Sequence, residues 1–530
     1  LHEEPASDEE VDRAKVQVRS DLAFHRESPA QILSALTESV AMGDWRRFPR
    51  EIAQSSAVTA EDVTRVAATY LTRRNLTAGW FVPEHGAGKG DAQQLRPRPR
   101  PCYLQRFSDR VELRDLPGGG QLAVLANPHA PTVTVGGSMR AGLMCATDGR
   151  FTVPGVTAAM LDRGTGDHSR LQLARELENQ GLQLGVEASA RYPTSISFSA
   201  HGLVEKLPRL VRLLVEVLRT PTFPIDELDK IREQLLGGLA RERQETFATA
   251  FSALSRRLYR QGHPYPRRPV EVREQEVSAL SRDDLEAFHS AAYGPASMVV
   301  AVVGQVDADQ VSSVLAEHLD GWQGGLSELP EAAPLGDQEP GEELIHIPDR
   351  PNLDVLLGHR AGLLIGDRDH PAAVLANSCL GQSTLTSRLG EAVRDRAGLT
   401  YGVYSRFFGT VHLPGPWATF LSVARDDLRK AVDLSRKVIE AYVADGPSTD
   451  ELEDERQSLA GAFRVGLATN SGVTRQLAIA LTAGLPVSHL DDYPEQLLAV
   501  SRDEVTAALK KHLHPERLVV TAAGTINDDT

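Results

Sequence analysis

The chain has 530 residues, of which 41% are hydrophobic and 24% charged, a balance typical of globular protein with several domains. Its formal net charge of −15 argues against nucleic acid as a principal partner, because nucleic-acid binding depends on basic side chains. No apolar run approaches the roughly 18 residues that a membrane-spanning helix needs, so no membrane span is expected. Three scattered cysteines, Cys102, Cys145 and Cys379, predict neither a disulfide framework nor a Cys-x-x-Cys metal site.

A short segment that opens a predicted helix occurs three times, at residues 58–63, 280–285 and 500–505. In each copy a Ser or Thr (Thr59, Ser281, Ser501) lies three residues before an acid, which is the pattern of an N-terminal helix cap. The copies are about 220 residues apart, far beyond the short periods of solenoids. Further helix starts at residues 8–11, 225–228 and 449–452 keep a similar interval. The sequence therefore predicts tandem homologous domains.

Two changes in composition mark predicted linkers. Residues 85–101 join a glycine-rich start to alternating Arg and Pro, which favours a flexible hinge followed by an extended spacer. Residues 321–341 are rich in Gly, Pro and Glu. The predicted units are a truncated domain at 1–84, a hinge linker at 85–101, and fuller domains at 102–322 and 342–530. Since the first unit holds only the rear of a repeat and Leu1 is not an initiator Met, we expect the chain to be the C-terminal part of a longer polypeptide.

The two fuller domains share one order of predicted elements. In the first, the periodicity predicts strands at 111–113, 121–125, 132–139, 184–190 and 195–200, and helices at 156–161, 171–180 and 207–218. In the second, it predicts strands near Leu344, Val355, Tyr401 and Thr419, and helices at 371–380, 388–396 and 428–442. Strand pairs followed by helices that cover one sheet face predict an α+β fold with a mostly antiparallel sheet in each domain.

One stretch is more specific than the rest. Residues 380–403 contain Ser-Arg-Leu at 387–389 and then an acid, Val-Arg, Gly-Leu and Tyr, ending at Tyr401. This stretch resembles a signature of the insulinase/pitrilysin family of zinc metallopeptidases, and Gly-His-Pro-Tyr at 262–265 with Arg268 is a second, weaker match. The resemblance covers nearly the whole chain. It implies α+β domains in tandem pairs that form half of a clamshell around a peptide substrate.

The zinc motif of that family is missing here. The family binds zinc through a His-x-x-Glu-His helix, in which the glutamate activates metal-bound water. None of the 16 histidines stands in that pattern, and the corresponding residues 154–165 offer neither a ligand pair nor a general base. Asp162 and His168 lie nearby and are interpreted as a surface contact. The resemblance therefore implies that this chain alone binds no metal, has no catalytic residue and is inactive, while upstream residues hold zinc in the complete protein.

Arg394 and Tyr401 are the predicted substrate-binding residues. In the family, an Arg and a Tyr seven residues apart reach from the inactive half and donate hydrogen bonds to substrate carbonyls, a role that suits a guanidinium and a phenol. From the residues alone an alternative stays open, in which Arg394 pairs with Glu391 and Tyr401 begins a core strand. Weaker candidates are His263, Tyr265, Arg191, Tyr192 and residues 406–408.

Two functions follow from the resemblance. The first is the non-catalytic half of a zinc endopeptidase, whose partners are peptide substrates and a zinc-bearing half on the same polypeptide or a separate subunit. The second is an inactive scaffold or partner subunit, resembling core proteins of respiratory or processing complexes. The Arg394 and Tyr401 pair favours the first, since a pure scaffold does not need it. We expect a soluble protein, periplasmic or cytoplasmic.

Overall fold

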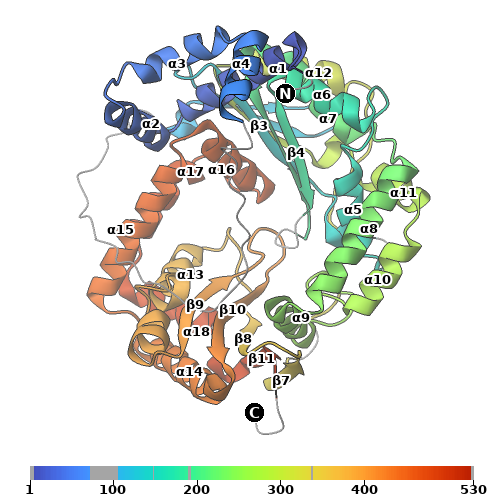
Figure 1. The fold of residues 1–530 in the computed structure, drawn as a ribbon. Helices are drawn as coiled ribbons and strands as arrows, with labels where there is room; N and C mark the ends of the chain where they lie inside the picture. The colour runs from blue at the N-terminus through green and yellow to red at the C-terminus, as the bar shows by residue number, and fades with distance from the viewer. Residues whose placement is uncertain (1–4, 72–105, 147–148, 189–192, 336–337, 527–530) are drawn as a thin grey trace.

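The computed structural model of the chain describes residues 5–71, 106–146, 149–188, 193–335 and 338–526. The predicted hinge linker at 85–101, the rear of the unit at 1–84, Cys102, and the candidates Arg191 and Tyr192 lie outside these residues. Two mixed sheets and the helices around them form an open ring (Figure 1). None of the helices in the described part of the chain is long and apolar enough to cross a membrane.

The chain begins with four helices: α1 (Asp8–His25), α2 (Pro29–Ala41), α3 (Arg47–Ser56) and α4 (Ala60–Tyr70). Helix α1 packs on the first sheet region through α6 and β5, and the Ser20 hydroxyl donates a 2.9 Å hydrogen bond to the Gly181 carbonyl. The side chain of Thr59 accepts a hydrogen bond from the backbone of Asp62 and caps α4. Ser281 and Ser501 cap α11 and α18 in the same way, so the predicted role of the repeated segment is confirmed.

The first sheet has six strands in the order β1-β2-β6-β3-β5-β4. Neighbouring strands are antiparallel except β2 and β6. The strands are β1 (Val111–Asp115), β2 (Gln121–Ala126), β3 (Thr132–Met139), β4 (Gln183–Ala188), β5 (Ile196–Leu203) and β6 (Val299–Gly304). The helices of this half are α5 (Thr152–Met160), α6 (Arg170–Gln180), α7 (Leu207–Arg219), α8 (Ile225–Glu242), α9 (Thr246–Leu258), α10 (Val270–Ala279), α11 (Arg282–Ala292) and α12 (Ala308–Leu319).

The second sheet has five strands in the order β7-β11-β8-β10-β9, of which only β7 and β11 pair in parallel. The strands are β7 (Gly341–His346), β8 (Asn352–Arg360), β9 (Thr400–Phe407), β10 (Pro416–Ala424) and β11 (Val519–Gly524). The helices are α13 (His370–Asn377), α14 (Leu428–Asp445), α15 (Thr449–Gly466), α16 (Asn470–Thr482), α17 (His489–Ala499) and α18 (Arg502–His512). Two π-helical turns, Ser378–Gln382 and Gly390–Arg396, follow α13, so the helix predicted at 388–396 has wider turns than an α-helix. The predicted α+β class with mostly antiparallel sheets is confirmed.

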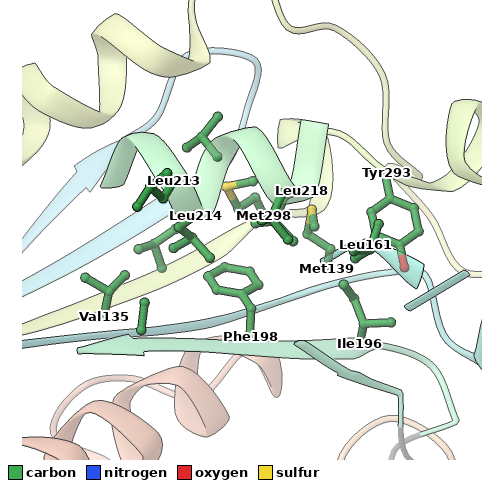
Figure 2. Close-up of a cluster of buried hydrophobic side chains, with 14 of the residues drawn as sticks. Val135, Met139, Leu161, Ile196, Phe198, Leu213, Leu214, Leu218, Tyr293 and Met298 are labelled. Carbon is green, nitrogen blue, oxygen red and sulfur yellow. The ribbon is translucent and has the colours of Figure 1, made fainter. Parts of the chain in front are cut away.

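The main core of the first half lies between one face of its sheet and α7. Figure 2 shows side chains of β3 and β5 packed against side chains of that helix. The strands contribute Val135, Met139, Ile196 and Phe198, and α7 contributes Leu213, Leu214 and Leu218. Val300 and Val302 of β6 belong to this core, whereas Ala301 and Val303 belong to a separate cluster. Since alternate residues of a strand point to opposite faces, the sheet is buried on both sides at β6.

The two halves cover each other's second face by exchanging a helix. Helix α16, from the second half, packs on β3 and β6 of the first sheet, with Val473, Leu477 and Ala480 buried there. Helix α9, from the first half, packs on β8 and β11 of the second sheet, with Ala250, Leu254 and Leu258 buried there. The 18-residue helices α8 and α15, which precede them, run along opposite sides of the ring (Figure 1). The exchange holds the two sheets in one assembly.

Candidate functional site

Tyr401 lies at the start of β9, the last strand of the second sheet, and its side chain is 92% exposed. A bulge in the strand pairing places it there. Val403 pairs with Leu421 and Thr400 pairs with Val423, so Tyr401 and Gly402 together face only Ser422. Such a two-against-one arrangement bends the strand and changes the direction of its side chains.

The Thr400 side chain stabilises this bulge. Its hydroxyl donates to the carbonyl oxygens of Gly402 and Ser422, at 2.9 and 2.7 Å, and accepts from the Gly402 N–H at 3.2 Å. Thr400 itself is buried. The exposed position of Tyr401 is therefore held by buried contacts of its neighbour.

Arg394 lies in the second π-helical turn and is fastened beside Tyr401. Its Nε donates a 2.9 Å hydrogen bond to the Tyr401 carbonyl, and its guanidinium lies 5.9 Å from the centre of the Tyr401 ring. One Nη contacts the Asp395 carboxylate at 2.8 Å. A guanidinium carries five N–H groups, so these contacts leave others for a ligand. The structure thus brings the two predicted substrate-binding residues together.

The alternative interpretation of this pair is wrong about the partner of Glu391 and right that Tyr401 begins a strand. The partner of Glu391 is Arg396, at 2.5 Å, because the wide turn places Arg396 rather than Arg394 beside it. Tyr401 does begin a strand that reaches the core, because Val403 of β9 is fully buried, but the bulge points Tyr401 itself to solvent.

Arg388, in the Ser-Arg-Leu part of the motif, has a structural role. Its guanidinium binds the Glu451 carboxylate through two contacts, of 2.7 and 2.8 Å, and lies 4.9 Å from the centre of the Tyr442 ring. Glu451 also closes the capping box of α15 with Ser448. The hydrogen bonds from Arg388 are the main reason that the pKa of Glu451 falls from its ordinary 4.5 to about 2. The pair ties the loop that precedes Arg394 to the start of α15.

Two glycines and a buried network fix the rest of this loop. A Cβ at Gly390 would collide with the Thr384 carbonyl oxygen, and one at Gly381 would meet the Ser405 hydroxyl at 2.5 Å. Buried Asn377 accepts hydrogen bonds from Ser405 and from the Trp417 indole at 2.8 and 2.7 Å. Strand β9 and the π-helical turns are therefore locked against α13.

Helix α5 occupies the place where the family's zinc helix is expected. Its residues Val153, Val156, Ala158 and Met160 are buried in the apolar core, so they do not fit a metal. Among the described residues, no three His, Cys, Asp or Glu side chains are grouped closely enough to hold a metal ion.

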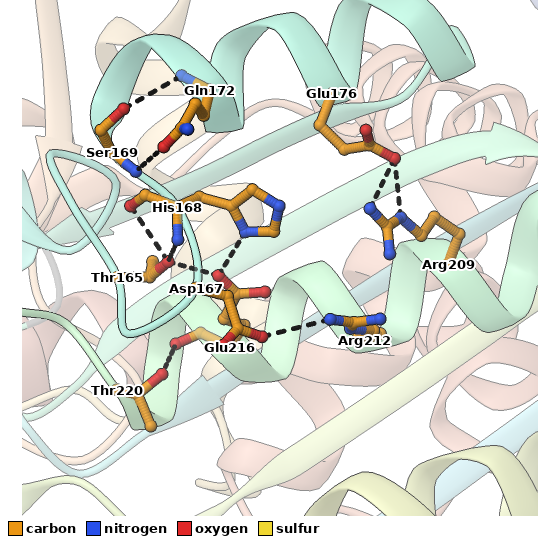
Figure 3. Close-up of polar contacts among 10 residues, drawn as sticks. All are labelled: Thr165, Asp167, His168, Ser169, Gln172, Glu176, Arg209, Arg212, Glu216 and Thr220. Atoms are coloured by element: carbon orange, nitrogen blue, oxygen red, sulfur yellow. Dashed lines mark hydrogen bonds and ion pairs between the residues drawn. The ribbon is translucent and has the colours of Figure 1, made fainter.

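The predicted contact between Asp162 and His168 is wrong. Asp162 pairs with the neighbouring Arg163, at 3.2 Å. The His168 Nδ1 instead lies 2.7 Å from the carboxylate of buried Glu216, which also accepts from the Thr165 hydroxyl (Figure 3). These contacts join the turn before α6 to α7, because Glu216 projects from α7 toward that turn.

The weaker candidates lie in packed positions. His263 is 1% exposed and stacks on Tyr259, and desolvation lowers its pKa to about 4. The Tyr265 hydroxyl donates a 2.6 Å hydrogen bond to the Leu413 carbonyl, which joins the two halves. In residues 406–408, Arg406 lies 5.8 Å from the ring centres of both Phe408 and Phe420.

One feature of the molecule gave no signal in the sequence. A cavity of about 980 Å³ lies between the first sheet and α16. The first sheet contributes residues 134–138 of β3, 185–187 of β4, and 197–199 and His201 of β5, together with Ser195 just before β5. The other side is lined by several residues between 465 and 482 and by Val411. Small polar residues dominate these segments, and composition alone gives no reason to bring them together.

Comparison with known proteins gives consistent results. Residues 279–459 match a family model described as "Peptidase M16 inactive domain". An uncharacterized zinc protease of Mycobacterium leprae is 26% identical over 368 residues, which are 68% of this chain and 80% of that protein. The crystal structure of a peptidase M16 inactive domain from Pseudomonas fluorescens superposes with a TM-score of 0.72 and 26% identity, over 79% of this chain and 98% of the other. The periplasmic protease PqqL from Escherichia coli shares the fold, with a TM-score of 0.69 and 14% identity, over 98% of this chain and 61% of its own. The tandem α+β fold is thus that of one half of a clamshell.

Proposed function

Because the chain belongs to the peptidase M16 family, the insulinase/pitrilysin peptidases, we propose that it is the non-catalytic half of a zinc endopeptidase. In this role it encloses a peptide substrate and holds it for a zinc site on another segment or subunit. The observation that carries the proposal is the pair formed by Arg394 and Tyr401. The Arg394 guanidinium is held between the Tyr401 carbonyl and the Tyr401 ring, and Tyr401 is 92% exposed. A side chain fixed in solvent by a buried neighbour is placed for a ligand.

Arg394 and Tyr401 would donate hydrogen bonds to backbone carbonyls of the substrate. Arg394 is anchored through its Nε, so its remaining N–H groups keep a fixed direction. Tyr401 stands at the free edge of the sheet, where a peptide can approach without displacing a strand. Zinc belongs to the complete enzyme in this proposal, and α5 contributes nothing to its binding.

We propose the same division of the chain as the sequence indicates. Residues 1–84 would be the rear of the second peptidase-like domain, 85–101 the hinge linker, 102–322 the zinc-free third domain and 342–530 the fourth. This division agrees with the separate sheets at 111–304 and 341–524.

Reconstitution tests the proposal. The chain alone, a candidate zinc-bearing half alone, and the two together are assayed with quenched fluorogenic peptides. Only the complete protein is expected to cleave them, and a chelator should abolish the activity. Chelator-sensitive cleavage by the 530-residue chain alone would contradict the assignment. A complete protein that cleaves no member of a peptide library would favour the scaffold function.

Substitutions then test the two residues in the complete enzyme. Arg394→Ala and Tyr401→Phe are each expected to lower kcat/KM about a hundredfold, since losing one preorganised donor costs about 3 kcal/mol. The double variant should lose less than the sum, because both groups hold one bound geometry. Arg396→Ala is the matched control, because Arg396 lies in the same turn with a side chain 73% exposed. A lower Tm with unchanged kcat/KM would show that the pair is only structural.

A further inference from the structure

The first four helices of the chain are one of three matching sets. Helices α1 to α4 are followed later in the chain by α8 to α11 and by α15 to α18. The first helix of each set has 18 residues, the second has 13, and three residues separate them in every set. The last helix has 11 residues and begins with the same capping box in all three sets. Helix α2 therefore takes the place that α9 and α16 take in their own sets.

Both counterparts of α2 lie on a sheet, whereas α2 does not. Helix α16 packs on β3 and β6, and α9 packs on β8 and β11. Within the described part of the chain the main contact of α2 is with α3, and α2 lies at the outside of the ring (Figure 1). Leu33 of α2 corresponds in position to Ala250 of α9 and to Thr474 of α16. Those two residues are 0% and 2% exposed, whereas Leu33 is 66% exposed. The position that contacts a sheet in α9 and α16 is therefore open in α2.

The open side of α2 carries an apolar stripe. Ile32, Leu33, Leu36 and Val40 are spaced so that they lie within about 100° of one another around the helix. Leu33 and Val40 are exposed, and Ile32 and Leu36 are half-buried. Trp45, just beyond the helix, is also exposed. The other positions of α2 are Pro, Ala, Ser, Thr, Gln and Glu. A helix with this pattern packs its apolar side on another apolar surface.

Buried polar contacts fix the direction in which α2 leaves the rest of the chain. Glu27, in the turn before α2, accepts hydrogen bonds from the Thr132 hydroxyl and, at 3.1 Å, from the Asn470 side-chain amide. Thr132 begins β3 and Asn470 begins α16, and both are buried. The Asn127 side chain donates a further 2.7 Å hydrogen bond to Asn470. The start of α2 is thus tied to the first sheet and to α16, so its apolar stripe is presented in one direction.

The surfaces under α9 and α16 show what kind of surface fits such a helix. Leu125, Ala301 and Val303 of the first sheet pack with α16, and Leu356 and Phe420 of the second sheet pack with α9. Each surface is a sheet face of small, branched and aromatic apolar side chains. Within the described residues both surfaces are already covered by those helices, so a second copy of this chain does not offer one to α2. The partner must bring a sheet of its own.

We propose that α2 docks on the apolar face of a β-sheet in the zinc-bearing half, as α9 and α16 dock on the two sheets of this chain. Docking buries Leu33 and Val40, and burial of apolar side chains favours association. The inference rests on the proposed function, which supplies the partner, and it identifies the surface through which that partner is held. The contact does not involve Arg394 or Tyr401.

Cysteine labelling compares the stripe with the residue next to it. The background carries Cys102→Ser, since Cys145 and Cys379 are buried. Leu33→Cys and Ser34→Cys are each labelled with a maleimide in the 530-residue chain and in the complete protein, and the α2 peptide is followed by mass spectrometry. Ser34 is exposed and lies about 100° further around the helix. Joining the zinc-bearing half should slow the labelling of Leu33→Cys about tenfold or more, whereas that of Ser34→Cys should change less than about twofold.

Charge substitutions test the same contrast through affinity. The zinc-bearing half is supplied as a separate protein, and its Kd for the 530-residue chain is measured by surface plasmon resonance. Leu33→Lys and Val40→Lys should each raise Kd about tenfold or more, because a charged group replaces an apolar group in the interface. Ser34→Lys adds the same charge outside the stripe and should leave Kd within about twofold. All three residues are exposed in the chain alone, so the substitutions leave its fold intact.

A photo-cross-linker identifies what covers the stripe. Benzoylphenylalanine in place of Leu33 should form an adduct with a strand of the zinc-bearing half, and an adduct with one of its helices or with a second copy of this chain would overturn the inference. Unchanged labelling of Leu33→Cys in a complete protein that cleaves peptides would overturn the interface alone. Protection of Leu33→Cys in a complete protein that cleaves no peptide would support the interface and contradict the proposed function.

Discussion

The ion pair between Arg388 and Glu451 should stabilise the second half of the chain by about 1–2 kcal/mol. A pKa of about 2 for Glu451, in place of the ordinary 4.5, corresponds to roughly 3 kcal/mol before solvent screening. Both side chains keep some exposure, 28% for Arg388 and 34% for Glu451, so water weakens the attraction. Because Arg388 binds Glu451 through two hydrogen bonds, the stabilisation left after screening should still exceed that of an ordinary surface ion pair.

A double-mutant cycle with Arg388→Met and Glu451→Gln measures this coupling. Glutamine keeps a side-chain acceptor for the cap at Ser448 while it removes the charge. Urea unfolding is followed by the fluorescence of buried Trp417 in a background where Trp45, Trp80 and Trp322 are replaced by Phe. The cycle for Arg282 and Glu286, an exposed pair four residues apart, is the control and should give about 0.3–0.5 kcal/mol.

The effect of pH gives an independent check of the same pair. Because the folded-state pKa of Glu451 is lowered, its contribution is fully present above pH 4.5 and is lost as the pH falls toward 2. The difference in unfolding free energy between the wild type and Glu451→Gln should therefore shrink over that interval. A coupling no larger than that of the control pair, or a difference that does not change with pH, would refute the reasoning.

Three further predictions concern the assembly of the chain. Leu254→Ala and Leu477→Ala, in the two exchanged helices, should each lower the free energy of unfolding in urea by about 2–5 kcal/mol. The control Leu33→Ala, at a residue 66% exposed on α2, should change it by no more than about 0.5 kcal/mol. Equal effects of the three substitutions would contradict the exchange of helices. Tyr265→Phe should cost about 1 kcal/mol, because it removes the hydrogen bond to Leu413, and an unchanged urea midpoint would show that this contact does not join the halves. Elemental analysis of the purified chain should find no stoichiometric zinc, since α5 is apolar, and one tightly held zinc per chain would contradict this.

Local features of this fold could be predicted from the sequence, and the exchange of helices could not. The caps at Thr59, Ser281 and Ser501 depend on residues three apart, so the sequence determines them almost alone. The apolar faces of α9 and α16 are also visible as periodicity, but a periodic face does not say which sheet it covers. The sequence also could not predict which arginine pairs with Glu391, because a π-helical turn changes which side chains lie next to each other.

The residues of the family motif have two different roles in the structure. Arg388 and Gly390 stabilise the loop, whereas Arg394 and Tyr401 lie where the loop meets the edge strand β9. Structural contacts explain why Arg and Gly stand at positions 388 and 390: Arg388 binds Glu451, and the Thr384 carbonyl leaves no room for a side chain at Gly390. Tyr401 has no comparable account, because a side chain 92% exposed adds little to the stability of a strand. Its bulge is nevertheless held by three hydrogen bonds of buried Thr400, and its carbonyl holds Arg394. The fold thus holds an exposed phenol beside a partly exposed guanidinium with little return in stability, and this is the physical reason for proposing a substrate-holding half rather than a scaffold.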